Sequence, residues 1–434
     1  MSEWKEYHLE GLCSLITDGK HGDCQNEAES GYYFLSVKDI SDNRLIYDNA
    51  RQITELDFLE THRRTNLKPG DILFTNTGTI GRMAIAPDDP KTSRTTFQKS
   101  VAILKPKQEI VIPKFLYYLL KFDNTRLSAL AAGTTQKNLL LKDFRSFKVQ
   151  IPGSQTQKAI ARILSSLDDK IELNRRMNET LEEMARAIFK DWFIDFGPTR
   201  AKQAGRAPYL PEPLWSLFPE AIDDETGLPI GWRFLSLGEM GKIVTGKTPS
   251  TKVPEYFGGD IPFITPSDME GGKGIHTTTR YLTDLGVNTV KSSLIPAGSI
   301  AVSCIGSDMG KVVYALRESI TNQQINSVVL SKEYSNEYLY YDLIGRKAEL
   351  QNLSRGGSAV PILNKTHFSQ IKSVIPSHPL LRKFDLIAKS ITDKDFANEK
   401  ESRTLAETRD RLLPKLMSGE IRVKEAEKMV EEVL

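Results

Sequence analysis

The chain has 434 residues and a formal net charge of +2, and 39% of its residues are hydrophobic, 26% charged and 8% aromatic. At about 100–200 residues per domain this length corresponds to two to four domains, and the composition excludes a disordered or fibrous protein. Three scattered cysteines exclude a disulfide framework and a four-cysteine zinc site. Without a secretory signal or an apolar run of roughly 18–20 residues, we expect a cytoplasmic protein with no membrane contact.

The first 152 residues recur as a second copy, at a period of about 224–228 residues. The matched runs keep their order and spacing across the whole copy, which chance similarity does not do. They are Phe34–Ile40 with Phe263–Met269, Gly70–Thr75 with Gly298–Ser303, Phe115–Tyr118 with Tyr338–Tyr341, and Val149–Pro152 with Val374–Pro376. The chain is therefore an internal duplication.

Each copy combines short apolar strands with Gly, Pro, Asn and Asp at the turns, and one helix. The expected strands include Ile72–Phe74 and Val101–Leu104 in the first copy, and Val312–Tyr314 and Val328–Leu330 in the second. The expected helices are Pro113–Lys121 and Asn336–Gln351. This pattern predicts two α+β domains in tandem.

A long helix follows each copy. In the first helix, apolar residues recur at alternating steps of four and three over five heptads, which is the seam of a coiled coil. The same seam, shifted by 224 residues, follows the second copy, and both seams turn polar at their centres, at Asn174 and Asn178 and at Asn398 and Ser402. We therefore predict that the two helices pair as an antiparallel coiled coil, about 60 Å long at ~1.5 Å per residue. The alternative is that each helix packs only on its own domain.

These patterns divide the chain into six segments. They are a first domain over 1–152, a helical region over 153–195, a linker rich in Pro, Gly and charge over 196–231, a second domain over 232–376, a second helical region over 377–419, and a tail over 420–434.

One stretch matches a phosphate-binding loop letter for letter, from Gly241 through Gly246-Lys247-Thr248. A true phosphate-binding loop continues into a helix at the Lys-Thr pair. Here Pro249 follows at once, so we do not expect that helix. Other catalytic motifs are missing and the six histidines form no ligand pattern. We therefore expect no catalysis, metal or cofactor on this chain. An enzyme that hydrolyses nucleotides is the alternative that these patterns disfavour.

Polar, Gly-rich loops recur at matched positions of the two copies, with different residues in each. Amide, hydroxyl and basic side chains can read base edges and hold phosphates, although for any single residue ordinary turn chemistry is the simpler interpretation. The candidates for DNA contact in the first copy are Lys20, Thr75, Asn76, Thr77, Thr79, Arg82, Arg94, Gln98, Lys99, Thr135, Gln136 and Lys137. Those of the second copy are Lys247, Ser303, Ser307, Lys311, Asn322, Gln323, Gln324 and Arg355.

The chain resembles the specificity subunit of type I restriction–modification systems over essentially its whole length. The stretches that carry the resemblance are Ile151-Pro152 with Thr156–Ala161, Ile163–Ser165, Leu167–Ile171 and Asn174, then Lys190–Phe196, and the linker run Tyr209-Leu210-Pro211 with Trp215 and Phe218-Pro219. Two features depart from that family: Gly153-Ser154 stands after Pro152 instead of a second proline, and the second copy lacks a glutamine matching Gln157.

The resemblance implies a non-catalytic subunit that reads a bipartite, asymmetric site on double-stranded DNA. It implies two modification subunits and restriction subunits as partners, with S-adenosylmethionine, ATP and Mg²⁺ bound by those partners. The helices would act as a ruler and a docking surface, through Gln157, Ile160, Leu164, Leu167, Ile171, Asn174, Leu181, Ile188, Ile391, Asn398, Leu405 and Leu412. The alternative function is a coiled-coil adaptor that binds only protein.

Overall fold

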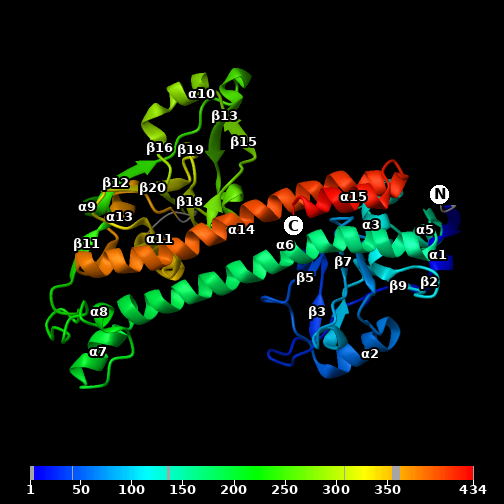
Figure 1. Cartoon of the computed structure of the whole chain (residues 1–434), viewed down its shortest axis with the longest axis horizontal. Helices are drawn as coiled ribbons and strands as arrows, with labels where there is room; N and C mark the ends of the chain where they lie inside the picture. The colour runs from blue at the N-terminus through cyan, green and yellow to red at the C-terminus, as the bar shows by residue number, and fades with distance from the viewer. Residues whose placement is uncertain (1–3, 42, 134–136, 307, 354–361, 434) are drawn as a thin grey trace. The chain divides into compact units, whose positions relative to one another are not determined.

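The computed structural model describes residues 4–41, 43–133, 137–306, 308–353 and 362–433 (Figure 1). The chain divides into two compact units. The first unit comprises residues 1–173 and 401–434, and the second comprises residues 174–400. Each unit therefore contains one copy of the duplicated domain together with part of each long helix.

The first copy is an α+β domain built on a four-stranded sheet in the order β2-β9-β6-β7. Its core includes the buried α3, in which Pro113 occupies the first turn, where the missing N–H costs nothing. Its elements are β1 (Lys5–His8), α1 (Leu9–Leu12), β2 (Cys13–Asp18), β3 (Tyr33–Leu35), β4 (Ile40–Ser41), β5 (Arg44–Leu45), α2 (Glu55–Thr65), β6 (Ile72–Thr75), β7 (Met83–Ile85), β8 (Thr95–Phe97), β9 (Val101–Pro106), α3 (Pro113–Phe122), α4 (Asn124–Ser128), α5 (Leu141–Ser146) and β10 (Lys148–Ile151).

The second copy repeats this plan with a five-stranded sheet in the order β12-β20-β17-β18-β14 and a four-stranded sheet in the order β15-β13-β19-β16. Its elements are β11 (Arg233–Ser236), α9 (Leu237–Met240), β12 (Gly241–Thr245), β13 (Phe257–Ile264), β14 (Gly274–Ile275), β15 (Arg280–Leu282), α10 (Asp284–Thr289), β16 (Leu294–Ile295), β17 (Ile300–Ser303), β18 (Val312–Ala315), β19 (Ser319–Thr321), β20 (Ile325–Leu330), α11 (Asn336–Ile344), α12 (Lys347–Leu353), α13 (Lys365–Ser369) and β21 (Lys372–Ile375).

The duplication is visible in the strand pairing. The first and last strands of each copy pair antiparallel, β1 with β10 and β11 with β21, with Lys5 opposite Ile151 and Arg233 opposite Ile375. A central strand pairs antiparallel with two neighbours in each copy, β6 with β7 and β9, and β17 with β18 and β20. The tandem α+β architecture is confirmed.

The long helices are α6 (Ser154–Phe189) and α14 (His378–Ser418). They pair antiparallel in each unit, since residues later in α6 meet residues earlier in α14. In the first unit, Asp168 pairs with Arg409 and Lys170 with Glu401. In Figure 1 the two helices run side by side within each unit. Every predicted seam residue on both helices is buried or half-buried, so the heptad pattern is confirmed.

Asparagine side chains join the two helices in the second unit, at the predicted polar centre of the seam. Asn174 Nδ2 donates to the backbone oxygen of Asn398 at 3.4 Å, and Asn178 Nδ2 donates to that of Asp395 at 3.1 Å. These contacts pair specific positions of α6 and α14, which is how a polar residue in a seam fixes register.

Residues 196–231, expected to form a linker, pack as part of the second unit. They contain α7 (Gly197–Gln203) and α8 (Glu212–Trp215), and Phe196, Phe218 and Leu228 are buried in its core. A single π-helical turn, Lys190–Ile194, precedes them and turns both Trp192 and Phe193 into the same core.

Two further expectations need adjustment. The helix expected over Asn336–Gln351 is two helices, α11 and α12, because it breaks at Gly345, a poor helix former, and Arg346, whose guanidinium binds the backbone of Lys372. The tail contains α15 (Val423–Glu431), which buries Ala426 and Val430 in the core of the first unit.

Candidate nucleic-acid interface

Polar loops converge in the first copy, because backbone hydrogen bonds join the β6–β7 turn to segments distant in sequence. Asn76 N donates to Ser100 O at 2.9 Å, and Leu139 N donates to Asn76 O at 2.8 Å. Lys99 N donates to Lys20 O at 3.0 Å, which adds the end of β2. The structure thus brings together four of the loops that the sequence singled out.

The second copy repeats this convergence. Cys304 N donates to Gln324 O at 2.7 Å, Leu363 N donates to Cys304 O at 2.9 Å, and Gly246 N donates to Ile325 O at 3.0 Å. In the repeat, Thr95–Phe97 (β8) therefore corresponds to Ser319–Thr321 (β19).

Several candidate residues build these loops from within. The buried hydroxyl of Thr75 donates to Thr79 O at 2.6 Å and accepts from Arg82 N at 2.9 Å. Ser303 takes the same place in the second copy, donating to Asp308 O and accepting from Lys311 N at 2.9 Å. Both hydroxyl groups are bonded to the backbone of their own turn. Thr75 and Ser303 would therefore shape an interface and not contact a ligand directly.

The basic residue that ends each turn reaches the same neighbouring segment. Arg82 Nη1 donates to Val37 O at 3.2 Å, and Lys311 Nζ donates to Pro266 O at 3.3 Å. Lys311 also pairs with the carboxylates of Asp308, at 2.9 Å, and Glu270, at 2.8 Å. Arg82 therefore presents more of its charge to solvent than Lys311 does.

Lys20 and Lys247, which follow the equivalent residues Gly19 and Gly246, each contact side chains of their own copy. Lys20 Nζ lies 2.7 Å from Asp57 Oδ1 and 3.0 Å from Glu60 Oε2, and the hydrogen bond that Lys20 donates to Asp57 raises the pKa of the lysine. Lys247 is exposed, and its Nζ donates to Ser292 Oγ at 3.2 Å.

Gly19 and Gly246 are required by close backbone packing. A Cβ at Gly19 would overlap the carbonyl oxygens of Phe97 and Gln98, and one at Gly246 would overlap those of Asn322 and Thr321. The chain leaves β12 as a loop with no helix at Lys247, so the phosphate-loop pattern lacks the helix N-terminus that would hold a phosphate.

The remaining candidates differ in exposure. Thr79, Arg94, Lys99, Lys137 and Gln323 are exposed, whereas Asn76 and Asn322 are buried and Thr77, Gln98 and Gln324 are half-buried. The Thr77 hydroxyl donates to Asn138 Oδ1 at 2.8 Å, and Asn322 Nδ2 donates to Gln324 Oε1 at 3.1 Å. Thr135, Gln136, Ser307 and Arg355 lie outside the described residues.

The buried side chain of Gln157 joins the start of α6 to the residue that precedes α3. Its Oε1 accepts from Ile112 N at 3.0 Å, and its Nε2 donates to Pro152 O at 2.9 Å. In the second copy the equivalent position is Leu381, which is buried in the apolar core. In the second copy an apolar core contact of Leu381 therefore takes the place of these hydrogen bonds.

A segment of the second copy that was not predicted from the sequence, Gly271–His276, lies against the helices, and we call it the strap. It holds a buried lysine, Lys273, against α11 and α14, and burial lowers the pKa of that lysine. The only sequence signal was the run of glycines around the lysine, Gly271-Gly272-Lys273-Gly274.

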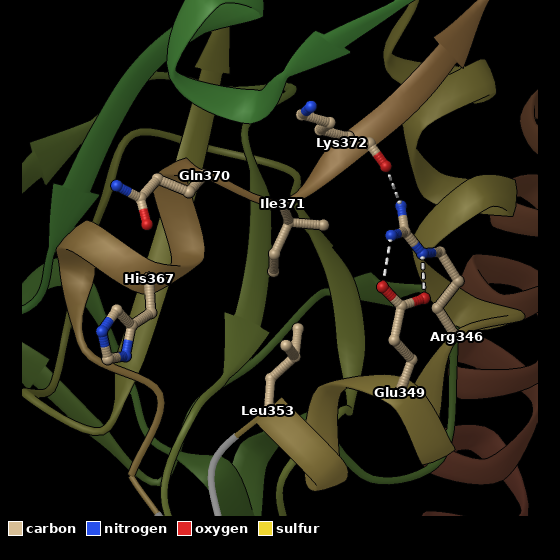
Figure 2. Close-up of a pocket in the computed structure, with 7 residues that line it drawn as sticks. All are labelled: Arg346, Glu349, Leu353, His367, Gln370, Ile371 and Lys372. Carbon is tan, nitrogen blue, oxygen red and sulfur yellow. Dashed lines mark hydrogen bonds and ion pairs between the residues drawn. The ribbon is translucent and has the colours of Figure 1, made fainter. Parts of the chain in front are cut away.

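Two shallow hollows lie apart from the candidate loop residues. One of about 540 Å³ is lined by residues of the second unit, and Figure 2 shows Arg346 there, bound between Glu349 and the Lys372 carbonyl. One of about 290 Å³ lies in the first unit, where Arg126 is bound to Asp123. Both guanidinium groups are therefore already paired with carboxylates.

The described residues contain no group of three or more His, Cys, Asp or Glu side chains able to hold a metal ion. Within the same ranges, none of the helices combines the length and the apolar character needed to cross a bilayer.

The sequence is similar to a family of known proteins. A family model described as "Type I restriction modification DNA specificity domain" matches residues 1–183 and 229–381. The specificity subunit of the type I restriction enzyme HindI from Haemophilus influenzae is 32% identical, over 97% of this chain and 100% of its own length. The MjaIX specificity subunit from Methanocaldococcus jannaschii is 28% identical, over 90% of this chain and 87% of its own.

A solved structure shares the fold. The crystal structure of the S subunit of a type I restriction–modification system from M. genitalium matches with a TM-score of 0.57 at 19% identity, over 96% of each chain.

Proposed function

Because this chain belongs to the family of type I restriction–modification DNA specificity subunits, we propose that its two copies are target-recognition domains that each read one half of a bipartite, asymmetric DNA site. As a specificity subunit it is non-catalytic. Its role in the complex is to select the DNA sequence, and the chemistry is performed by other subunits.

One observation carries the proposal: the two copies share a framework but differ in the polar loops that the framework brings together. Thr75 and Ser303 brace equivalent turns, whereas the exposed residues differ, with Thr79 and Lys99 in the first copy and Gln323 in the second. A constant scaffold with different polar side chains suits two domains that read different base sequences.

The long helices support a spacer role in this proposal. In each unit, α6 and α14 form an antiparallel pair with a buried apolar seam. A paired helix resists bending more than a single one, so the pair would set the distance between half-sites. In the division into six segments, the domains at 1–152 and 232–376 would read DNA, and the helical regions at 153–195 and 377–419 would form the spacer.

The partners and cofactors follow from the same assignment. We propose two modification subunits that bind S-adenosylmethionine, and restriction subunits that use ATP and Mg²⁺, all acting in the cytoplasm on double-stranded DNA. The partner-binding residues would lie along the helical regions.

The test is to co-express the chain with its modification subunit and map N6-methyladenine across the genome, with and without the gene for this chain. A split motif that appears only with the gene supports the proposal and gives both half-sites. A stable complex without new methylation, together with no sequence discrimination in a DNA competition assay, would favour the adaptor function instead.

A further inference from the structure

The strap, Gly271–His276, lies directly against α14 within the second unit. A Cβ at Gly272 would overlap Glu399 Oε1, and one at Gly274 would come within 2.7 Å of Phe396 Cε1. Gly271 has a φ of +91°, which lets the chain turn there. The glycines therefore bring the strap backbone closer to the helix than other residues would permit.

Lys273 enters the space that this close approach creates. Its Nζ donates to Thr392 Oγ1 of α14 at 2.6 Å and to Tyr341 Oη of α11 at 2.8 Å. Its side chain is only 5% exposed, and its ammonium lies 4.4 Å and 4.6 Å from the ring centres of Tyr341 and Tyr340. Hydrogen bonds and aromatic faces thus replace the water that the ammonium loses.

Carboxylates of α11 and α6 also lie near the ammonium of Lys273. Glu337 Oε2 of α11 lies 3.6 Å from Nζ and accepts from Thr392 Oγ1 at 2.6 Å. Glu182 Oε2 of α6 lies 3.9 Å from Nζ and accepts from Tyr341 Oη at 3.0 Å. One ammonium therefore links the second recognition domain to both long helices.

A second contact lies further along the strap, where His276 Nε2 is 2.5 Å from Glu399 Oε2 of α14. The first copy is attached to its helices by different chemistry: Tyr118 Oη donates to Asp168 Oδ2 at 2.6 Å, and Asp168 pairs with Arg409 at 2.5 Å. The buried lysine is thus a feature of the second domain.

We propose that Lys273 is a positioning residue that fixes the second recognition domain on the helix pair, and so sets the spacing at which the second half-site is read. This inference rests on the proposed function. A change of one base pair in the spacer moves a half-site by about 3.4 Å and turns it by roughly a tenth of a turn. Only a domain held firmly to the spacer helices can discriminate so small a displacement.

The experiment uses the full complex with its modification subunits and duplexes carrying the mapped site with the native spacer or with one base pair added or removed. In Lys273→Met the ammonium is lost and the stem is kept, whereas Lys332→Met makes the same change at an exposed position of the same domain. We expect Lys273→Met to lower the preference for the native spacer by about tenfold, because a displacement of an ångström is enough to weaken a fitted contact. Lys332→Met should keep that preference.

Thr392→Val keeps the shape of the helix surface and removes one acceptor of Lys273, so it tests the same link if Lys273→Met fails to fold. It should weaken the spacer preference in the same direction, by a smaller factor. A folded Lys273→Met or Thr392→Val complex with the wild-type spacer preference would overturn the inference. A wild-type complex that recognises no bipartite site would instead overturn the proposed function, so the two failures are distinguishable.

Discussion

The side-chain amide of Asn398 donates to the side-chain oxygen of Asn178 at 2.7 Å, from α14 to α6 within the second unit. Asn178 is itself bound to the backbone of Asp395, so the two asparagines form a connected polar link inside an otherwise apolar seam. A sliding movement of one helix along the other would break the whole link at once.

Replacing Asn398 by Leu should lower the free energy of unfolding by about 1–3 kcal/mol, because it leaves the oxygen of the half-buried Asn178 without its donor. The double replacement Asn178→Leu with Asn398→Leu should recover that loss, since two apolar side chains pack well in a seam. Urea denaturation measures both. A double variant no more stable than Asn398→Leu would show that the link does not act as a pair.

Replacing Leu167 and Ile171 by Asp should separate the two helices and abolish recognition of the bipartite site. Leu167 is fully buried in the core of the first unit, and an unpaired carboxylate there costs several kcal/mol, on the order of 3–5. Circular dichroism and methylation mapping measure the two effects. Leu173→Asp, an exposed leucine on the same helix, is the control for helix content. Intact reading of both half-sites would contradict the spacer role of the helices.

Gly246→Ala should destabilise the second unit by about 1–3 kcal/mol, because the added Cβ overlaps the backbone oxygens of Thr321 and Asn322. Gly19→Ala should do the same in the first unit. Lys247→Ala, at an exposed side chain, should change stability by less than about 0.5 kcal/mol. Denaturant unfolding distinguishes the three.

Calorimetry with Mg-ATP provides the complementary measurement on the wild-type chain. We expect no binding, since Gly246 serves backbone packing and no helix begins at Lys247. Binding that Lys247→Ala removes would restore the phosphate-loop interpretation.

Asp395 should make the second unit less stable as the pH rises from about 4 to 7. Burial raises its pKa to about 7, with Glu399 and Glu182 adding to the effect and Lys273 opposing it, and its Oδ2 has no hydrogen-bond partner among the described residues. The folded state therefore retains a proton between pH ~4 and 7 that the unfolded chain has released, so stability falls across that window and the loss is complete above it.

Asp395→Asn removes that titration. The melting temperature of the variant relative to wild type should therefore increase from pH 5 to pH 8. Asp224→Asn, at an exposed aspartate of the same unit, is the matched control. An equal difference at both pH values for Asp395→Asn would contradict the prediction.

The duplication, the long helices and their seams could be predicted because they depend on periodicity and order along the chain. The seams of α6 and α14 need only heptad spacing, and the strands β6 and β9 need only apolar runs bounded by turns. The absence of a helix after Lys247 was predictable from Pro249 alone.

The features that the sequence did not predict depend on contacts between distant residues. Nothing near Lys20 in the sequence indicates its pairing with Asp57, and nothing near Lys273 indicates Thr392, 119 residues away. The segment with α7 and α8 was predicted to be a linker because apolar residues are sparse in it. Its buried residues, such as Phe218 and Leu228, pack against residues of the second copy that are distant in sequence.

The pairing of β1 with β10 and of β11 with β21 means that each domain leaves its sheet beside the point where it entered. A recombination event that replaced the residues between such a strand pair would insert a new domain without altering the length or phase of the helix that follows. On the proposed function, one such exchange would change the half-site that one domain reads while the helices and their seam stay unchanged.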